Sequence, residues 1–200
     1  MRWTRVLAVT GLAAALGASL AAVSCSPTGS PSSAPVAMTA EEKIAHGKYI
    51  ATISGCMDCH TPGTFYGAPD TTRMLSGTEL GWTGPWGTTY PKNLTPDVET
   101  GIGSWSEEQI EHALRTGVRP DGSPLLPPMP WALYAHYTDK DMGALIAYLK
   151  SIPPVKHVNP PVLPPGKTGT LPALVFPPPP AWDAMNLPAP GTPAAAGGAH

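Results

Sequence analysis

The pattern of apolar and polar positions predicts three amphipathic helices, each opened by a capping signal. The first begins at the capping box of Thr39 and Glu42 and is expected to run to about Ser54. The residues expected on its buried face are Ile44, Tyr49 and Ile53. Gly47 lowers the helix propensity by about 1 kcal/mol relative to alanine. We expect this glycine to allow a second helix to approach closely.

The second and third helices follow later in the chain. Ser106 and Gln109 form the second capping box, and Gly117 is placed to end that helix as its C′ residue. The third helix opens at Thr138 and is stopped by a Pro-Pro pair at 153–154. Its apolar stripe recurs at three- and four-residue spacing and consists of Met142, Leu145, Ile146 and Leu149.

Residues 61–104 carry little helical periodicity and are punctuated by glycine and proline. A loop of this length in a compact domain is normally functional or wraps around something. With three main helices and long loops, the pattern predicts an all-α domain over residues 39–152.

The chain begins with a segment typical of export. Arg2 and Arg5 precede an apolar run, and residues 1–24 are predicted to be a signal peptide. The run ends at Ala22-Val23-Ser24-Cys25, which resembles the lipobox of bacterial lipoproteins and implies a lipid-carrying Cys25. The alternative is an uncleaved membrane span. Either alternative places the domain on the periplasmic side, anchored to a membrane.

Two segments flank the predicted domain. Residues 25–38 consist mainly of Ser, Pro, Thr, Gly and Ala, and we expect a flexible tether. Residues 153–200 form a proline-rich tail that favours extended conformation and cannot supply a helix or a central strand. Its apolar residues predict that 153–183 lies along the surface of the domain or of a partner. The end from 186 is expected to be disordered.

The charge composition of the chain argues against one class of function, nucleic-acid binding. Only 13% of the residues are charged and the net charge is −2, so nothing in the sequence indicates a nucleic-acid partner. No histidine and carboxylate pair stands out beside a candidate nucleophile, and we therefore expect no small-molecule substrate.

The residues that carry chemistry form a C-x-x-C-H motif at Cys56, Cys59 and His60. Two thiols one helical turn apart can add across the two vinyl groups of one haem, and the adjacent imidazole can then ligate the iron. The alternatives are a thioredoxin-like redox site and half of a zinc site. A zinc site needs about two further ligands, and the remaining cysteine is Cys25. The motif indicates one covalently attached haem c.

A second axial ligand is expected from Pro127-Pro128-Met129-Pro130-Trp131, where the prolines stiffen the loop around Met129. A methionine opposite a histidine raises the reduction potential of a haem and fills the sixth position. Other residues remain open as alternatives: Met57, Met74, Met142, His46, His112, His136 and His157.

Several stretches between residues 40 and 155 resemble the class I cytochrome c domains of bacterial alcohol, aldehyde and sugar-acid dehydrogenase cytochrome subunits. The stretches are CMDCHTPG from Cys56, NLTPD from Asn93, TGIGSW from Thr100, LRTGVRPDG from Leu114, and the Pro-Met-Pro centred on Met129. The resemblance implies the class I cytochrome c fold, thioether bonds at Cys56 and Cys59, and His60 and Met129 as the axial pair.

The same resemblance implies a function. The chain is expected to be a monohaem cytochrome that carries single electrons between a membrane-associated or periplasmic dehydrogenase and the respiratory chain, with redox proteins as partners. The alternative is a haem enzyme or a gas or redox sensor with a labile sixth ligand. Asn93, Gly103 and Trp105 are candidates for contacts with a haem propionate, or else residues that only shape turns and pack.

Overall fold

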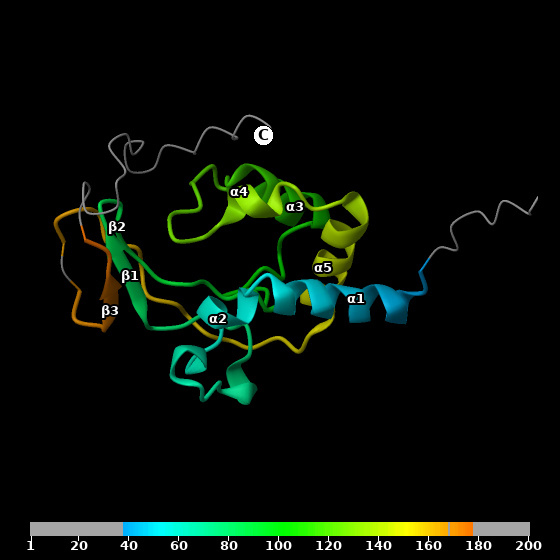
Figure 1. Cartoon of the computed structure of the whole chain (residues 1–200), viewed down its shortest axis with the longest axis horizontal. Helices are drawn as coiled ribbons and strands as arrows, with labels where there is room; N and C mark the ends of the chain where they lie inside the picture. The colour runs from blue at the N-terminus through cyan, green and yellow to red at the C-terminus, as the bar shows by residue number, and fades with distance from the viewer. Residues whose placement is uncertain (1–37, 168, 178–200) are drawn as a thin grey trace, which may run out of the picture. The chain divides into compact units, whose positions relative to one another are not determined.

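The computed structural model describes residues 38–167 and 169–177. The predictions for the signal peptide, for Cys25, for the tether before residue 38 and for the end of the tail lie outside the described residues. Figure 1 shows the order of the elements. They are α1 Ala40–Ile53, α2 Cys56–His60, the 3-10 turns Thr64–Tyr66 and Thr71–Arg73, β1 Gly81–Gly84, β2 Gly87–Thr89, α3 Glu107–Thr116, α4 Trp131–Tyr134, α5 Asp139–Ser151 and β3 Ala173–Val175.

The three predicted helices are confirmed as α1, α3 and α5. The side chains of Thr39 and Ser106 each accept a hydrogen bond from the backbone N–H of the third residue of their helix. The side chain of that third residue in turn accepts a hydrogen bond from the backbone N–H of the capping residue. Thr138 caps α5 by accepting from the Asp141 backbone N–H. Gly117 closes α3 in the left-handed conformation, with φ 73°. Local capping chemistry therefore set the helix boundaries.

The buried face of α1 differs from the prediction in part, since Ile44 packs against the core as expected but the other two residues do not. Tyr49 and Ile53 are 58% and 61% exposed, whereas Gly47, Ile50 and Ala51 are buried. A Cβ built on Gly47 would overlap the Ala144 carbonyl oxygen of α5 and lie 2.7 Å from Tyr148 Cβ. The face of α1 that carries the glycine is the face that meets α5, which confirms the close approach expected there.

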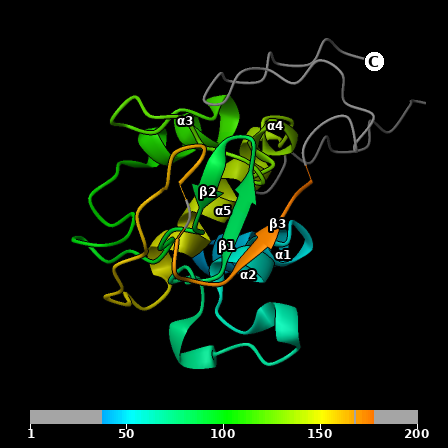
Figure 2. The same cartoon turned by 90° about the vertical axis from the view of Figure 1, so that its left-hand side faces the viewer.

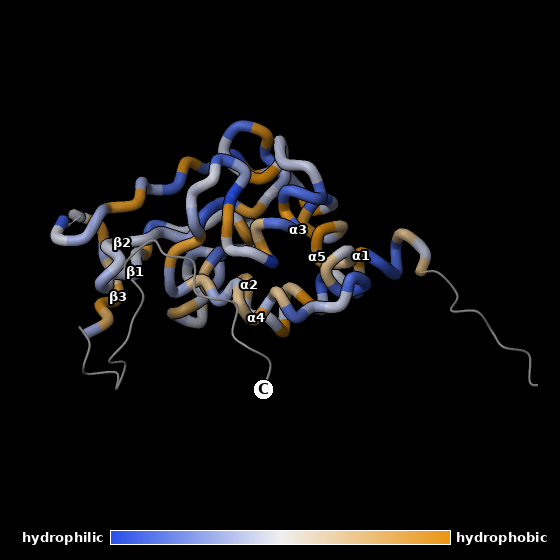
Figure 3. The backbone as a smooth tube through the Cα atoms, turned by 90° about the horizontal axis from the view of Figure 1, so that it is seen from above, coloured by the Kyte–Doolittle hydropathy of each residue, from blue (hydrophilic) through white to orange (hydrophobic). Residues whose placement is uncertain are grey.

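The hydrophobic core lies around this helix pair. The predicted stripe of α5 is confirmed, since Met142, Leu145, Ile146 and Leu149 are all buried. Ile50 and Ala51 of α1 and Ile110 of α3 belong to the same cluster. Among the described helices, none is long and apolar enough to cross a membrane. Figure 3 accordingly shows hydrophobic and hydrophilic positions interleaved along the described chain.

The prediction of a wholly helical fold is wrong in part, because the structure contains a small sheet with strand order β2-β1-β3. Figure 2 shows the three strands side by side. β1 and β2 form a tight antiparallel hairpin, in which the Trp86 ring packs against Gly84 where a Cβ would stand. Strands of three or four residues are too short to give an alternating pattern in the sequence.

The proline-rich tail supplies the third strand. β3 pairs in parallel with β1 at the edge of the sheet, where neighbouring prolines cost no ladder bonds. Upstream, Leu163 and Thr88 exchange two backbone hydrogen bonds. The prediction that the tail lies along the domain is confirmed for its described residues. The packed structure thus continues past the predicted boundary at 152.

Candidate functional site

A cavity of about 440 Å³ lies over the C-x-x-C-H motif, within the size range of cofactor sites. Cys56, Cys59 and His60 line it from α2, and Met129 lines it from the segment just before α4. Figure 1 shows α2 and α4 separated from each other, with α4 above α2 in this view. The structure brings together the four residues that the sequence analysis selected. Much of the remaining lining is apolar, including Ile102, Ile110, Leu114, Leu126, Leu145 and Leu149.

His60 is held in one tautomer. Its Nδ1 lies 2.6 Å from the backbone carbonyl oxygen of Lys92, and a ring nitrogen facing a carbonyl must carry the proton. The other ring nitrogen, Nε2, therefore keeps a free lone pair. Burial lowers the pKa of His60 to about 4, against the weaker opposing effect of the Lys92 hydrogen bond. The imidazole is neutral at physiological pH, as a metal ligand must be.

The two thiols follow a left-handed turn. Gly55 has φ 68° and directs the chain from α1 into α2, so that Cys56 is buried and Cys59 is partly exposed. Burial raises the pKa of Cys56 to about 11 and also raises the pKa of Cys59. In the described part of the chain, no group of three or more His, Cys, Asp or Glu side chains could hold a metal ion. The half-zinc-site alternative therefore finds no further ligands there.

The loop that carries Met129 is fastened at several points. Thr89 Oγ1 donates to the Pro127 carbonyl at 2.8 Å, which ties the loop to β2. The Leu125 N–H donates to the Gly117 carbonyl at 2.7 Å, which ties it to the end of α3. The Met129 N–H donates to Leu126 O at 3.2 Å. Backbone hydrogen bonds and proline stiffness together fix this side of the cavity.

The alternative axial ligands occupy other places. Among the described methionines and histidines, only His60 and Met129 line the cavity. His46 Nε2 is 2.7 Å from Asp141 Oδ1, and His157 Nε2 is 3.2 Å from Glu79 Oε1. Met142 is fully buried in the core. The structure therefore favours Met129 over the other candidates.

The three candidates for a propionate contact differ in whether their donors are already used and in whether they line the cavity. Both amide N–H groups of Asn93 already donate, to Thr100 Oγ1 at 3.1 Å and to Val155 O at 2.8 Å. The Gly103 N–H donates to Asp97 O at 3.1 Å, and Gly103 does not line the cavity. The structure thus favours the turn-shaping alternative for Asn93 and Gly103. Asn93 and Trp105 both line the cavity, and Trp105 is partly buried.

Two cationic residues that the sequence analysis missed also line the cavity, Lys92 and Arg119. Lys92 Nζ donates to the Pro160 carbonyl, and Arg119 donates to Ser123 Oγ at 3.0 Å and Pro124 O at 2.7 Å, all neutral acceptors. Burial and the charge of Arg119 lower the pKa of Lys92. Burial also lowers the pKa of Arg119, opposed by Asp121. Their place on the lining depends on tertiary structure, and no local pattern distinguishes them from surface cations.

The residues present fit a covalently attached haem. The cavity is mostly apolar, it holds a neutral buried imidazole with a free Nε2, and it adds two free thiols and a thioether. Covalent attachment of a haem uses the two thiols, the imidazole can ligate its iron, and the thioether can fill the sixth position. Two cations on the lining would complement its carboxylates.

Comparison with known proteins agrees with this chemistry. The cytochrome c family model matches residues 44–153. This chain belongs to the cytochrome c family. The predicted resemblance to dehydrogenase cytochrome subunits is confirmed by the relatives it matches.

The "Alcohol dehydrogenase (quinone), cytochrome c subunit" of Gluconobacter oxydans (strain 621H) is 38% identical over 120 residues, which is 60% of this chain and 23% of that protein. The "Fructose dehydrogenase cytochrome subunit" of Gluconobacter japonicus is 33% identical over 164 residues, 80% of this chain and 31% of the relative. A "Diheme cytochrome c-type" protein of Cereibacter sphaeroides is 33% identical over 123 residues, 60% of this chain and 39% of that protein. The matched part thus spans well under half of each relative.

Proposed function

We propose that this chain is a monohaem c-type cytochrome that carries single electrons and is not itself a catalytic subunit. The observation that carries the proposal is the presence of Cys56, Cys59, His60 and Met129 on the lining of one apolar cavity. The cytochrome c family match supports it. The single C-x-x-C-H motif supports a count of one haem.

Each residue has a role in this proposal. Cys56 and Cys59 would hold the haem through thioethers, while His60 Nε2 and the Met129 sulfur would be the axial ligands. When bound, the haem supplies the Fe(III)/Fe(II) couple. Met129 would hold the iron on the side opposite the protein's histidine ligand, and a closed site of this kind would separate a carrier from an enzyme or sensor with a labile ligand. Trp105, Lys92 and Arg119 would face the carboxylates, and the apolar lining excludes water.

The partners are proposed from the relatives. Relatives of this domain are named as cytochrome subunits of alcohol, fructose and gluconate dehydrogenases. We therefore propose a membrane-associated or periplasmic dehydrogenase as electron donor and a component of the respiratory chain as acceptor. Such redox encounters are usually small and transient. Purification from detergent-solubilised membranes, followed by assay for a dehydrogenase that co-purifies, checks this partnership.

The experiment that tests the carrier proposal is Met129→Leu, which removes the thioether and nearly conserves volume. Haem attachment should persist, since Cys56, Cys59 and His60 are intact. The reduction potential should fall, the weak sulfur-to-iron absorption band at the red end of the Fe(III) spectrum should disappear, and the Fe(II) protein should bind carbon monoxide. Met74→Leu is the matched control because Met74 does not line the cavity. A Met129→Leu protein with the parent's spectrum, potential and carbon monoxide resistance would refute this ligand.

A further inference from the structure

The hydrogen bond that His60 makes continues into the proline-rich tail. His60 Nδ1 donates to the Lys92 carbonyl oxygen at 2.6 Å. The Asn93 N–H belongs to the same peptide group as that carbonyl, and it donates to Asn159 Oδ1 at 2.6 Å. The two bonds thus act on opposite ends of one peptide unit. The imidazole, the peptide and the Asn159 amide form a continuous chain.

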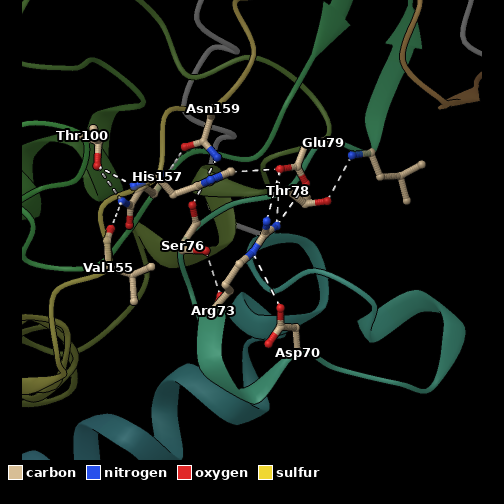
Figure 4. A network of polar contacts seen from close by, with 11 residues as sticks. Asp70, Arg73, Ser76, Thr78, Glu79, Thr100, Val155, His157 and Asn159 are labelled. Atoms are coloured by element: carbon tan, nitrogen blue, oxygen red, sulfur yellow. Dashed lines mark hydrogen bonds and ion pairs between the residues drawn. The ribbon is translucent and has the colours of Figure 1, made fainter.

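The orientation of the Asn159 amide is fixed from both sides. Its Nδ2 donates to the Ser76 carbonyl at 3.1 Å, so its oxygen must be the atom that faces the Asn93 N–H. Figure 4 shows Asn159 beside Ser76 in a network of polar contacts. Gly77 makes room for this side chain, because a Cβ there would overlap Asn159 Nδ2 and lie 2.8 Å from Asn159 Cγ. Gly77 also donates its N–H to the His60 carbonyl at 2.8 Å.

The tail is fastened on both sides of Asn159. Before it, the Val155 N–H donates to Thr95 Oγ1 at 3.1 Å, and the His157 N–H donates to Thr100 Oγ1 at 3.0 Å. After it, the Pro160 carbonyl accepts from Lys92 Nζ. Asn93 itself is only 2% exposed, so water does not compete for this peptide. The asparagine is thus held against the peptide by its neighbours.

A bond to one end of a peptide strengthens the bond at the other end, because hydrogen bonds in a chain polarise one another. Because Asn159 Oδ1 accepts a hydrogen bond from the Asn93 N–H, it polarises the peptide group. The Lys92 carbonyl oxygen then carries more negative charge and is a better acceptor for the His60 Nδ1 proton. An imidazole that shares its proton more strongly is a more basic metal ligand. A more basic proximal ligand stabilises Fe(III) over Fe(II) and lowers the reduction potential.

We propose that Asn159 is a positioning residue for the proximal ligand, acting on His60 through the Lys92–Asn93 peptide and holding the reduction potential down. The inference rests on the proposed function, in which His60 ligates the iron of haem c. Asn159 lies outside the segment that matches the cytochrome c family, residues 44–153. The tail thereby becomes part of the redox site.

The test compares two substitutions in the full-length haem-loaded protein by redox titration and by NMR of the Fe(II) state. Asn159→Ala removes the acceptor and should raise the Fe(II)/Fe(III) ratio at fixed solution potential by about three- to tenfold, where tenfold is about 59 mV for one electron. The His60 Nδ1 proton resonance should move upfield as its hydrogen bond weakens. Asn159→Asp keeps an acceptor and should not raise the potential above the parent value.

The matched control is His157→Gln, which removes another tail contact without touching the chain to His60. It should leave the potential and the Nδ1 resonance unchanged. Equal shifts in His157→Gln and Asn159→Ala would overturn the proposal, since loosening of the tail would then explain both. Parent-like values in Asn159→Ala would overturn it as well.

Two further measurements keep the result decisive. In the parent Fe(II) protein, the Asn93 amide proton should resonate downfield and exchange slowly, and rapid exchange would overturn the proposal even if a variant failed to assemble. Covalent haem and the sulfur-to-iron band report on the proposed function separately. Their absence from the parent would refute the ligand assignment, whereas their presence with an unshifted potential in Asn159→Ala would refute only the role of Asn159.

Discussion

At the scale of single residues, the charged side chains on the cavity lining stand out because two cations, Lys92 and Arg119, face a single carboxylate, Asp121. Lys92 and Arg119 both line the cavity, and burial lowers the pKa of each. Bringing two like charges together in a partly buried place is unfavourable, and the single carboxylate of Asp121 offsets only one of them, so a further anion is favoured here. A haem propionate is an anion of the required kind. These two residues, more than Asn93 or Gly103, are therefore placed to receive it.

Arg119→Gln tests this role by removing one of the two cations. A nearby cation favours the charged form of a carboxyl group, so its loss should raise the propionate pKa by about one unit. Protonation of the propionate raises the reduction potential, and the resulting step in a plot of potential against pH should move to higher pH. Redox titration at a series of pH values measures the position of this step.

Lys48→Gln, an exposed charge change on α1, is the control and should leave the step in place. A step at the parent's pH in Arg119→Gln would show that this guanidinium does not face a propionate.

At the scale of secondary-structure elements, the contact between α1 and α5 determines how the core is built. Gly47 of α1 lies against Ala144 and Tyr148 of α5 at a distance that excludes any side chain. The glycine weakens α1 by about 1 kcal/mol in helix propensity. The close approach offsets this cost, because Ile50 and Ala51 on the same face become buried against α5.

Gly47→Ala should therefore destabilise the protein, although alanine is the better helix former. The added methyl group overlaps the backbone of α5, and overpacking of this kind costs about 1–3 kcal/mol. Urea unfolding of the haem-loaded protein, followed by far-UV circular dichroism, measures the loss.

Gly143→Ala is the matched control on α5, since a Cβ there meets only the flexible end of the Lys43 side chain, Cε at 3.7 Å and Nζ at 3.8 Å. It should leave the stability unchanged or raise it by up to about 1 kcal/mol. Equal effects of both substitutions would contradict the packing argument.

At the scale of the whole molecule, the tail and the helical domain form one folded unit over the described residues. The tail supplies β3, bridges to Thr88 through Leu163 and holds the Lys92–Asn93 peptide through Asn159. The proposed export and lipid anchor concern residues 1–25, beyond the described part. They are supported by the apolar run after Arg2 and Arg5 and by the lipobox-like sequence that ends at Cys25.

Cys25→Ser tests the anchor without touching the haem site. If Cys25 carries acyl chains, the substitution should remove the anchor and release haem protein into the soluble periplasmic fraction, because acylation supplies the membrane affinity. Fractionation of cells and detection of covalent haem in each fraction measure the outcome. A variant that stays membrane-bound and uncleaved, as an uncleaved span would, contradicts lipidation.

The sequence by itself determined the local features of this protein. Capping boxes at Thr39 and Ser106, the cap at Thr138 and the left-handed Gly117 depend on side chains a few residues apart, so the helix boundaries could be read directly. The C-x-x-C-H motif identified the cofactor for the same reason, since its chemistry needs two thiols and an imidazole within one helical turn.

Tertiary structure alone decided the features that join distant segments. The sequence predicted a close helix approach at Gly47 but could not show that α5 is the helix that approaches, or that Tyr49 lies outside the contact, because several faces were compatible with a helix. It could not place Lys92 and Arg119 on one cavity, or bring Asn159 to the peptide that accepts the His60 proton. Those contacts span up to 66 residues of sequence separation and depend on how loops and tail pack around the helices.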